Sequence, residues 1–151
     1  MTENKNVRLS DVYPIIKETL ENGGEVTFNP RGTSMLPLLV QGCDSVTLVP
    51  VTKKLKKYDL PLYRRKSGQF VLHRIVGCEK DGTYTMCGDN QWEYEKGIEK
   101  SDIIGVVSLV KHNGKIIKCN IFKYKCYCRY IVFYRQLRKK ASFIKHNVLK
   151  R

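Results

Sequence analysis

The stretch VLHRIVG, residues 71–77, interrupts an apolar strand pattern with two neighbouring polar residues, His73 and Arg74. Burying either side chain costs free energy unless the fold supplies a partner for it. A lone histidine in such a place is more often a structural residue than a catalytic base. The other histidines, His112 and His146, fall in a hairpin and in a basic tail, so His73 is the best candidate for a general base.

Short strand-like runs lie on both sides of this stretch, and turn sequences separate several of them. Short runs joined by hairpin turns predict a compact, strongly bent β domain. The runs are residues 44–50, 58–64, 68–77, 82–87 and 103–110, with a further strand at 25–29. The turn signals are Lys66-Ser67-Gly68, Lys80-Asp81-Gly82, Gly88-Asp89-Asn90 and Asn113-Gly114, the last of which predicts a closing hairpin.

Apolar residues at helical spacing mark both ends of the chain. The first stripe consists of Leu9, Val12, Tyr13, Ile16 and Leu20, with Ser10 as N-cap and Gly23-Gly24 as the end of the helix. The second stripe consists of Cys126, Tyr130, Phe133, Leu137, Ala141, Ile144 and Val148. Lysine and arginine lie mostly elsewhere around this second helix, which makes it basic and amphipathic, with a break expected near Ser142. We therefore expect a β domain with its helix in residues 1–119 and a basic helical extension in residues 120–151.

Charge is distributed unevenly along the chain. The sequence has 28 Lys and Arg against 14 Asp and Glu, a formal net charge of +14. Residues 103–151 hold 13 of the basic residues and no acidic one, so the first 102 residues carry a net charge of only +1. Such a segment attracts an anionic partner, and its aromatic residues favour an anionic membrane surface over nucleic acid for residues 120–151. The alternative is a solvated face that only keeps the protein soluble.

The cysteines and the N-terminus bear on metal binding and location. The six cysteines include no C-x-x-C pair, and Cys126-x-Cys128 is too tight for an ordinary zinc site, so we expect no metal and no cofactor. The N-terminal MTENKNVRLSDVYP is polar and lacks the apolar core of a signal peptide. No apolar stretch approaches the length of a membrane span. We therefore expect a cytoplasmic protein with reduced thiols, or one that lies peripherally on the inner face of the membrane.

The segment RGTSMLPLL, residues 31–39, joins two predicted strands and is apolar, yet it carries Ser34. A serine hydroxyl attacks a carbonyl only when a base takes its proton. The backbone N–H groups of Gly32, Thr33 and Ser34 are candidate donors to the oxyanion that then develops. From residue type alone, a simple turn serine is the more frequent case.

The turn CGDNQ, residues 87–91, follows a predicted strand, and its Asp89 carboxylate is a candidate to orient an imidazole. G-D-N is also a common turn sequence. Ser34, His73 and Asp89 are each a weak indication alone. Their order, and their places in or beside the strands of one small β domain, strengthen the three as a set.

As an ordered set, these segments resemble the signal peptidase I and LexA-like serine peptidases. GTSMLPLL resembles the family's nucleophile box, YDLPLYRR its G-D-x-V-x-x-x strand, LHRIVG the box that carries the base, and CGDN its G-D-N box. The boxes follow the family's order over about residues 31–91, and the resemblance extends over roughly residues 24–110. It implies the family's mainly β, compact, bent-sheet peptidase fold, here with a short N-terminal helix and a basic C-terminal helical extension.

The resemblance also implies roles for single residues. Ser34 matches the nucleophile, His73 the base and Asp89 the acidic residue of the G-D-N box. Bacterial signal peptidases and LexA-like proteins usually have lysine in place of His73, and the histidine form resembles the archaeal and endoplasmic-reticulum signal peptidases. The family's side-chain oxyanion donor falls at Gly32, so a backbone N–H must serve instead. The candidate substrate-pocket residues are Met35, Leu36 and Pro37.

Two differences from the family change the expected substrate. Signal peptidases place a membrane span just before the nucleophile box, whereas this sequence has a short polar helix and a strand there. We also expect no DNA-binding domain of the kind that LexA-like repressors carry. We therefore expect a bacterial or archaeal endopeptidase that cleaves a leader or precursor peptide through an acyl-enzyme. The alternative is a catalytically inactive, peptidase-like binding module whose basic tail holds membrane or nucleic acid.

Overall fold

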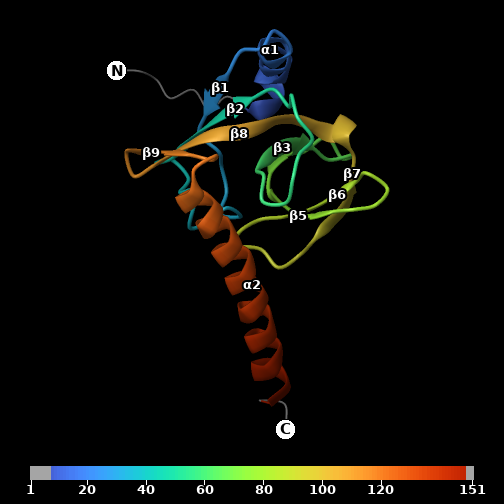
Figure 1. Cartoon of the computed structure of the whole chain (residues 1–151), viewed down its shortest axis with the longest axis vertical. Coiled ribbons are helices and arrows are strands. Elements are labelled where there is room, and N and C mark those ends of the chain that lie inside the picture. Colours follow the sequence, from blue (N-terminus) through green and yellow to red (C-terminus); the bar gives the residue numbers. More distant parts are fainter. Residues whose placement is uncertain (1–7, 149–151) are drawn as a thin grey trace.

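One long strand, β8 (Ile103–His112), runs through the β body and pairs antiparallel with three other strands. It belongs to a six-stranded sheet of order β1-β2-β8-β3-β4, to which β9 adds beside β8. The other strands of this sheet are β1 (Val26–Phe28), β2 (Ser45–Val49), β3 (Pro61–Arg64), β4 (Phe70–Leu72) and β9 (Lys115–Lys118). The computed structural model describes residues 8–148, with side chains as far as residue 142, and Figure 1 shows the curl of this sheet.

A second, smaller sheet packs against the first. It has the antiparallel order β5-β6-β7, and a 3-10 turn, Lys100–Asp102, leads from it into β8. Its strands are β5 (Arg74–Cys78), β6 (Tyr84–Cys87) and β7 (Glu95–Ile98). The last of these was not predicted, because a short run of mostly charged and glycine residues has no strand pattern.

The run at residues 68–77, predicted as one strand, forms two strands that belong to different sheets. His73 is the single residue between β4 and β5. Beyond it, Ile75 exchanges backbone hydrogen bonds with Tyr58 (2.8 Å) and Asp59 (2.9 Å), so β5 lies against the segment that precedes β3 and not against β3 itself. The chain therefore changes sheets at His73, and this places the imidazole between the two layers.

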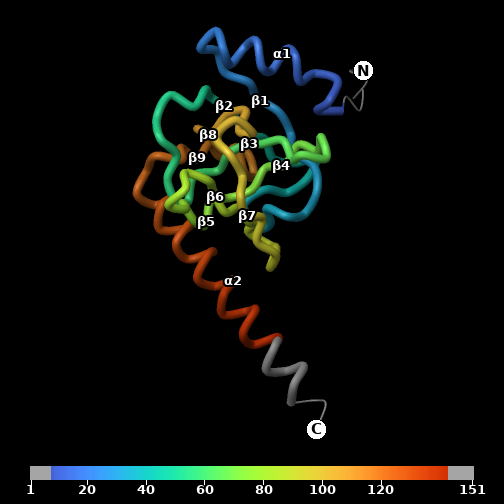
Figure 2. The backbone as a smooth tube through the Cα atoms, turned by 90° about the vertical axis from the view of Figure 1, so that its right-hand side faces the viewer, coloured from blue at the N-terminus to red at the C-terminus, as the bar shows by residue number. Residues whose placement is uncertain are grey.

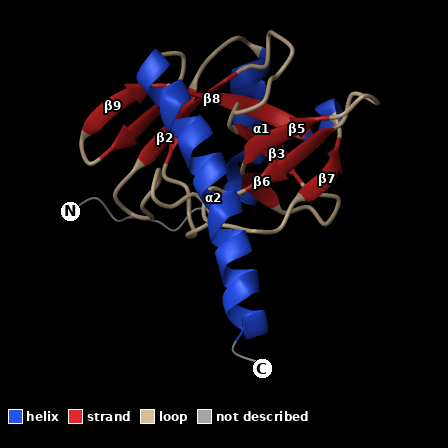
Figure 3. Ribbon diagram, turned by 60° about the horizontal axis from the view of Figure 1, so that its bottom comes forward, coloured by secondary structure: helices blue, strands red, loops and turns tan. Residues whose placement is uncertain are grey.

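A helix lies at each end of the described chain. The first, α1 (Leu9–Glu21), covers one side of the β body and ends before Gly23, whose φ of +77° favours glycine. The second, α2 (Phe122–Val148), packs along the body with its first half and then projects beyond it (Figures 1, 2 and 3). Contrary to the prediction, α2 has no break near Ser142 and continues as one helix to Val148.

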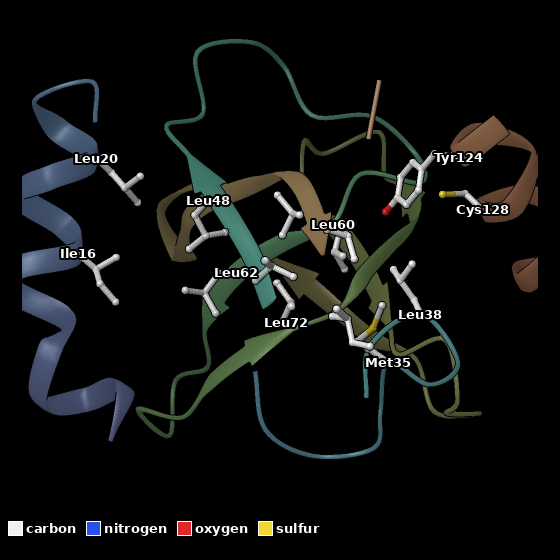
Figure 4. Close-up of a cluster of buried hydrophobic side chains, with 14 residues drawn as sticks. Ile16, Leu20, Met35, Leu38, Leu48, Leu60, Leu62, Leu72, Tyr124 and Cys128 are labelled. Atoms are coloured by element: carbon white, nitrogen blue, oxygen red, sulfur yellow. The ribbon is translucent and has the colours of Figure 1, made fainter. Parts of the chain in front are cut away.

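The apolar core consists of two clusters. The larger one lies between α1, the six-stranded sheet and α2, and Figure 4 shows its side chains. The smaller one lies between the two sheets and consists of Leu55, Tyr63, Val71, Ile75, Tyr84 and Met86. Tyr124 and Cys128 of α2 belong to the larger cluster, so the first half of α2 packs as part of the β body.

The face that α2 buries differs from the predicted apolar stripe. The buried residues are Tyr124, Cys128, Ile131, Val132 and Arg135. The predicted stripe is exposed at Cys126, Tyr130, Phe133, Leu137 and Ala141, and the side chains of Ile144 and Val148 lie outside the described residues. The helix is therefore apolar on two sides, one of which faces solvent.

The predicted fold class is confirmed at the level of architecture: a mainly β, antiparallel body with a short N-terminal helix and a C-terminal helix. The closing hairpin is also confirmed, because Asn113 and Gly114 join β8 to β9 with φ angles of +48° and +77°. These are the left-handed conformations that an Asn-Gly turn adopts most easily.

Asp44 ties the long loop between β1 and β2 to this hairpin. Its fully buried carboxylate accepts hydrogen bonds from the Val40 N–H (2.7 Å) and the Asn113 N–H (3.1 Å), and it pairs with His112 Nδ1 (2.6 Å). Burial opposes ionisation of Asp44, but these hydrogen bonds outweigh it and lower its pKa below the ordinary value. The His112 imidazole thus pairs with Asp44 and has a structural role, whereas the predicted base is His73.

Asp44→Asn is expected to lower the free energy of unfolding by about 1–3 kcal/mol, because it leaves buried donors poorly satisfied. A carboxyl with a lowered pKa stabilises the fold above its unfolded pKa of about 3.9, and this contribution disappears as the pH falls through the folded value. Urea unfolding at neutral and acidic pH should therefore show the difference between wild type and variant shrinking in acid. Exposed Glu93→Gln serves as the control, and an equal loss in that variant would contradict the assignment.

Candidate active site

A cleft of about 310 Å³ brings Ser34 and His73 together on one surface. Its walls come from the loop after β1, from β4 and its end, and from the turn after β6. The lining residues are Pro30, Arg31, Gly32, Thr33, Ser34, Met35, Leu39, Arg65, Gln69, Phe70, Val71, Leu72, His73 and Gln91. A larger hollow of about 760 Å³ beside α1 contains neither Ser34 nor His73.

The loop that carries Ser34 is anchored by its own apolar residues. Met35, Leu38 and Leu39 are buried in the larger core cluster, and Figure 4 shows Met35 and Leu38 beside β-sheet side chains. Hydrogen bonds from the Leu36 N–H to Thr33 O (3.2 Å) and from the Leu39 N–H to Met35 O (3.0 Å) form consecutive turns. Ser34 is consequently held half-buried at the rim of the cleft.

The G-D-N turn packs directly on this loop. The Asn90 N–H donates to Ser34 O (2.8 Å), and Asn90 Nδ2 donates to Thr33 O (3.2 Å). A Cβ atom on Gly88 would lie 2.6 Å from Ser34 O and 3.1 Å from Ser34 Cβ, so only glycine fits there. The turn therefore positions the loop of Ser34, the candidate nucleophile, through Gly88 and Asn90.

Two of the three predicted oxyanion donors are free. The Gly32 N–H donates to Gln41 Oε1 at 2.7 Å and is already occupied. Among residues 8–148, the N–H groups of Thr33 and Ser34 donate to no acceptor. The N–H groups of Thr33 and Ser34 therefore remain candidate oxyanion donors, whereas that of Gly32 is engaged by Gln41.

His73 is almost completely buried, with 2% of its surface exposed, and its imidazole has partners on one side only. Its Nδ1 lies 3.2 Å from Glu95 Oε1 and 3.3 Å from Tyr63 Oη. Its Nε2 has no hydrogen-bond partner in the part of the chain that the structure describes. An Nδ1–H donated to Glu95 fixes the tautomer in which Nε2 carries the basic lone pair.

Glu95 is a member of the site that sequence reasoning missed. It is partly buried on β7, and it forms a two-pronged ion pair with Arg65, in which Nε lies 2.7 Å from Oε2 and Nη2 contacts Oε1. Burial works against ionisation, but the hydrogen bonds from Arg65 prevail and lower the pKa of Glu95. Its segment EYEKGIEK is rich in charged residues, so no local pattern distinguishes Glu95 from a surface residue.

Burial lowers the pKa of His73 below its ordinary value, because the imidazolium is poorly solvated between the two sheets. The negative charge of Glu95 opposes this effect, whereas the positive charge of Arg65 adds to it. The imidazole is therefore neutral at neutral pH, which is the state that a general base requires.

Asp89 does not lie against His73 as predicted. Its Oδ1 and Oδ2 accept hydrogen bonds from Arg74 Nε (2.7 Å) and Nη2 (2.6 Å), and both side chains are fully buried. Tyr127 of α2 adds a weak hydrogen bond to Oδ2 at 3.4 Å. Arg74 engages both oxygens of Asp89, so the carboxylate that contacts the imidazole is that of Glu95. Asp89 instead anchors the G-D-N turn to Arg74.

The predicted substrate-pocket residues are only partly in the cleft. Met35 lines it, whereas Leu36 and Pro37 are not among its lining residues. Its apolar wall is supplied by Leu39, Phe70, Val71 and Leu72.

Comparisons with protein-family models, with curated proteins and with solved structures found no match. Among the described residues, no group of three or more His, Cys, Asp or Glu side chains is arranged to hold a metal ion.

Arg74→Met is expected to lower the free energy of unfolding by about 3–5 kcal/mol, because it leaves the Asp89 carboxylate buried without a counter-charge. The double variant Arg74→Met/Asp89→Leu should recover much of this loss, because it removes both charges and keeps apolar volume. Urea unfolding of the two single variants and the double variant completes the cycle. Additive losses in the double variant would show that the two residues act independently.

Proposed function

We propose that this chain is a serine endopeptidase of the signal peptidase I/LexA-like type, with Ser34 as nucleophile and His73 as general base. One observation carries the proposal: Ser34 and the buried imidazole of His73 line the same cleft, and the Glu95 carboxylate contacts Nδ1 of that imidazole, which leaves Nε2 free. Nucleophile, base and orienting group are the parts that serine acyl transfer needs.

In the proposed reaction, Ser34 Oγ attacks the scissile carbonyl carbon while His73 Nε2 takes its proton. The N–H groups of Thr33 and Ser34 bind the oxyanion, and the ionised Glu95 stabilises the imidazolium. His73 then returns the proton to the leaving amine, which leaves an acyl-enzyme on Ser34. Water, deprotonated by His73, hydrolyses this ester and restores the serine.

The sheet edge beside the cleft suits an extended peptide substrate. Strand β4 is the last in the order β1-β2-β8-β3-β4, and its residues Phe70, Val71 and Leu72 line the cleft. A substrate strand added to this edge gains main-chain hydrogen bonds, while the apolar wall selects side chains. This geometry supports a leader or precursor peptide, extended and unfolded around its cleavage site, as the substrate.

A second candidate is an inactive, peptidase-like binding module. Ser34 Oγ and His73 Nε2 form no hydrogen bond with each other in this structure, and such a bond is the signature of an activated serine. Active sites without substrate often have long catalytic distances that tighten in the complex, so the peptidase remains the better supported function. Covalent labelling separates the two candidates.

Ser34→Ala and His73→Ala are each expected to reduce labelling by a fluorophosphonate probe and peptide cleavage by about 10³-fold or more. The double variant should be no worse than either single one, because the two residues act as one unit. The exposed turn serine Ser67 provides the control, Ser67→Ala, with unchanged activity. Labelling that survives Ser34→Ala, or wild type that never labels, would favour the binding module.

Glu95→Gln is expected to lower the activity at its pH plateau by about 10²-fold or more, because the imidazolium loses its stabilising charge. In wild type, cleavage should fall as the pH drops through a His73 pKa below about 6.5, because protonation removes the base. Glu95 raises the pKa of His73, so its neutralisation should move this acid limb to still lower pH. Rate profiles of wild type, Glu95→Gln and the control Glu93→Gln test this, and a limb that stays in place or moves to higher pH would contradict the role of Glu95.

A further inference from the structure

A row of large apolar side chains is exposed along α2. Phe122 is 79% exposed, Tyr130 and Phe133 are each 60% exposed, and Leu137 is 47% exposed. Tyr134 stacks on Tyr130 with ring centroids 5.7 Å apart. We call this surface the outer stripe, and it consists of Phe122, Cys126, Tyr130, Phe133, Tyr134, Leu137 and Ala141.

The outer stripe lies on the opposite side of α2 from its buried face. Successive residues of an α-helix are rotated by about 100°, so Phe133 and Leu137 project about half a turn away from Ile131 and Arg135. Packing on the β body therefore cannot cover the outer stripe. Its members recur at spacings of three and four residues over five turns of helix, which is the pattern of a surface that binds along its length.

The positive charge around the outer stripe indicates which class of partner this surface binds. The described side chains of α2 include no Asp or Glu, and its basic residues are Lys123, Lys125, Arg129, Arg135, Arg138, Lys139 and Lys140. A second copy of this chain would bring two strongly positive helices together, which opposes self-association. Nucleic acid would satisfy the charge, but aliphatic Leu137 and Ala141 have no role in contacts to phosphates or in base stacking.

We propose that the outer stripe binds the surface of an anionic lipid membrane, with α2 lying in the plane of the interface. Aromatic and aliphatic side chains enter the boundary between headgroups and acyl chains, while lysine and arginine contact lipid phosphates. None of the helices in residues 8–148 has both the length and the apolar character to cross a membrane. Tyrosine and phenylalanine beside lysine and arginine are the composition of an interfacial helix.

Membrane binding by α2 also positions the candidate active site. On the inner face of the helix, Arg135 Nη1 donates to Gly88 O (3.2 Å), and Lys139 Nζ donates to Trp92 O (3.5 Å). The turn between these two acceptors contains Gln91, which lines the cleft. A membrane on the outer face thus lies at a fixed position relative to the cleft. The binding itself does not depend on the peptidase activity.

Co-sedimentation of the full chain with lipid vesicles tests the proposal, using phosphatidylcholine alone and phosphatidylcholine mixed with phosphatidylglycerol. Wild type should pellet with the anionic vesicles and far less with the neutral ones. Leu137→Asp places a charge on the outer stripe, and exposed Gln136→Asp makes the same charge change on the adjacent, polar side. Leu137→Asp should weaken binding well beyond the about fivefold that one charge accounts for, and Gln136→Asp by about fivefold at most.

Several results would overturn the proposal. Equal losses in Leu137→Asp and Gln136→Asp would mean that charge alone attracts the protein to vesicles. Failure of wild type to pellet, together with a tight shift of DNA in a gel, would assign the surface to nucleic acid. A wild-type dimer that Leu137→Asp converts to a monomer would assign it to self-association. Unfolding temperatures of both variants, expected to match wild type because both positions are exposed, show that the helix stays intact.

Discussion

The buried ion pair between Arg74 and Asp89 is the interaction on which the rest of this structure depends. A guanidinium without solvent contact costs free energy unless it finds a counter-charge and hydrogen-bond acceptors, and each nitrogen of Arg74 has at least one such partner. Arg74 Nη1 donates to Tyr58 O (3.0 Å), and this carbonyl belongs to a residue held at the unfavourable φ of +82°. The same nitrogen contacts Tyr124 Oη (3.2 Å) and Cys128 Sγ (3.0 Å) of α2. One side chain thus joins the smaller sheet, the G-D-N turn, the segment before β3 and the C-terminal helix.

The two polar residues of the VLHRIVG stretch, His73 and Arg74, have different partners and different roles in the site. Side chains of successive residues in extended chain point in opposite directions, so His73 faces Glu95 and Tyr63 while Arg74 faces Asp89 and α2. Asp89, fixed by Arg74, sits between Gly88 and Asn90, which contact the loop of Ser34. The chain therefore places His73, the proposed base, directly. It places Ser34, the proposed nucleophile, indirectly, through the ion pair of Asp89 with Arg74, the residue next to His73.

Sequence reasoning found the residues whose local context is unusual and missed those whose role comes from tertiary pairing. Ser34 in an apolar loop and His73 in an apolar strand stand out, and they line one cleft. Asp89 was recognised, but its predicted partner was the histidine, because sequence order does not reveal that the adjacent arginine competes for the carboxylate. Glu95 reaches the site only because β6 and β7 pair Met86 with Glu95, a register that no local pattern encodes.

The C-terminal helix α2 is a second case in which the sequence pattern alone did not reveal the tertiary contacts. Helical periodicity predicted one apolar face, yet α2 has two, because the buried face includes Arg135 and therefore does not read as apolar in sequence. Arg135 is tolerated inside because its guanidinium donates to Gly88 O and lies 5.4 Å from the centre of the Tyr94 ring. Once the inner face is used for these contacts, the strongly periodic apolar residues remain on the outside. A helix that folded only for its own stability would bury those residues, so their exposure is the physical reason for proposing that the outer face binds a membrane.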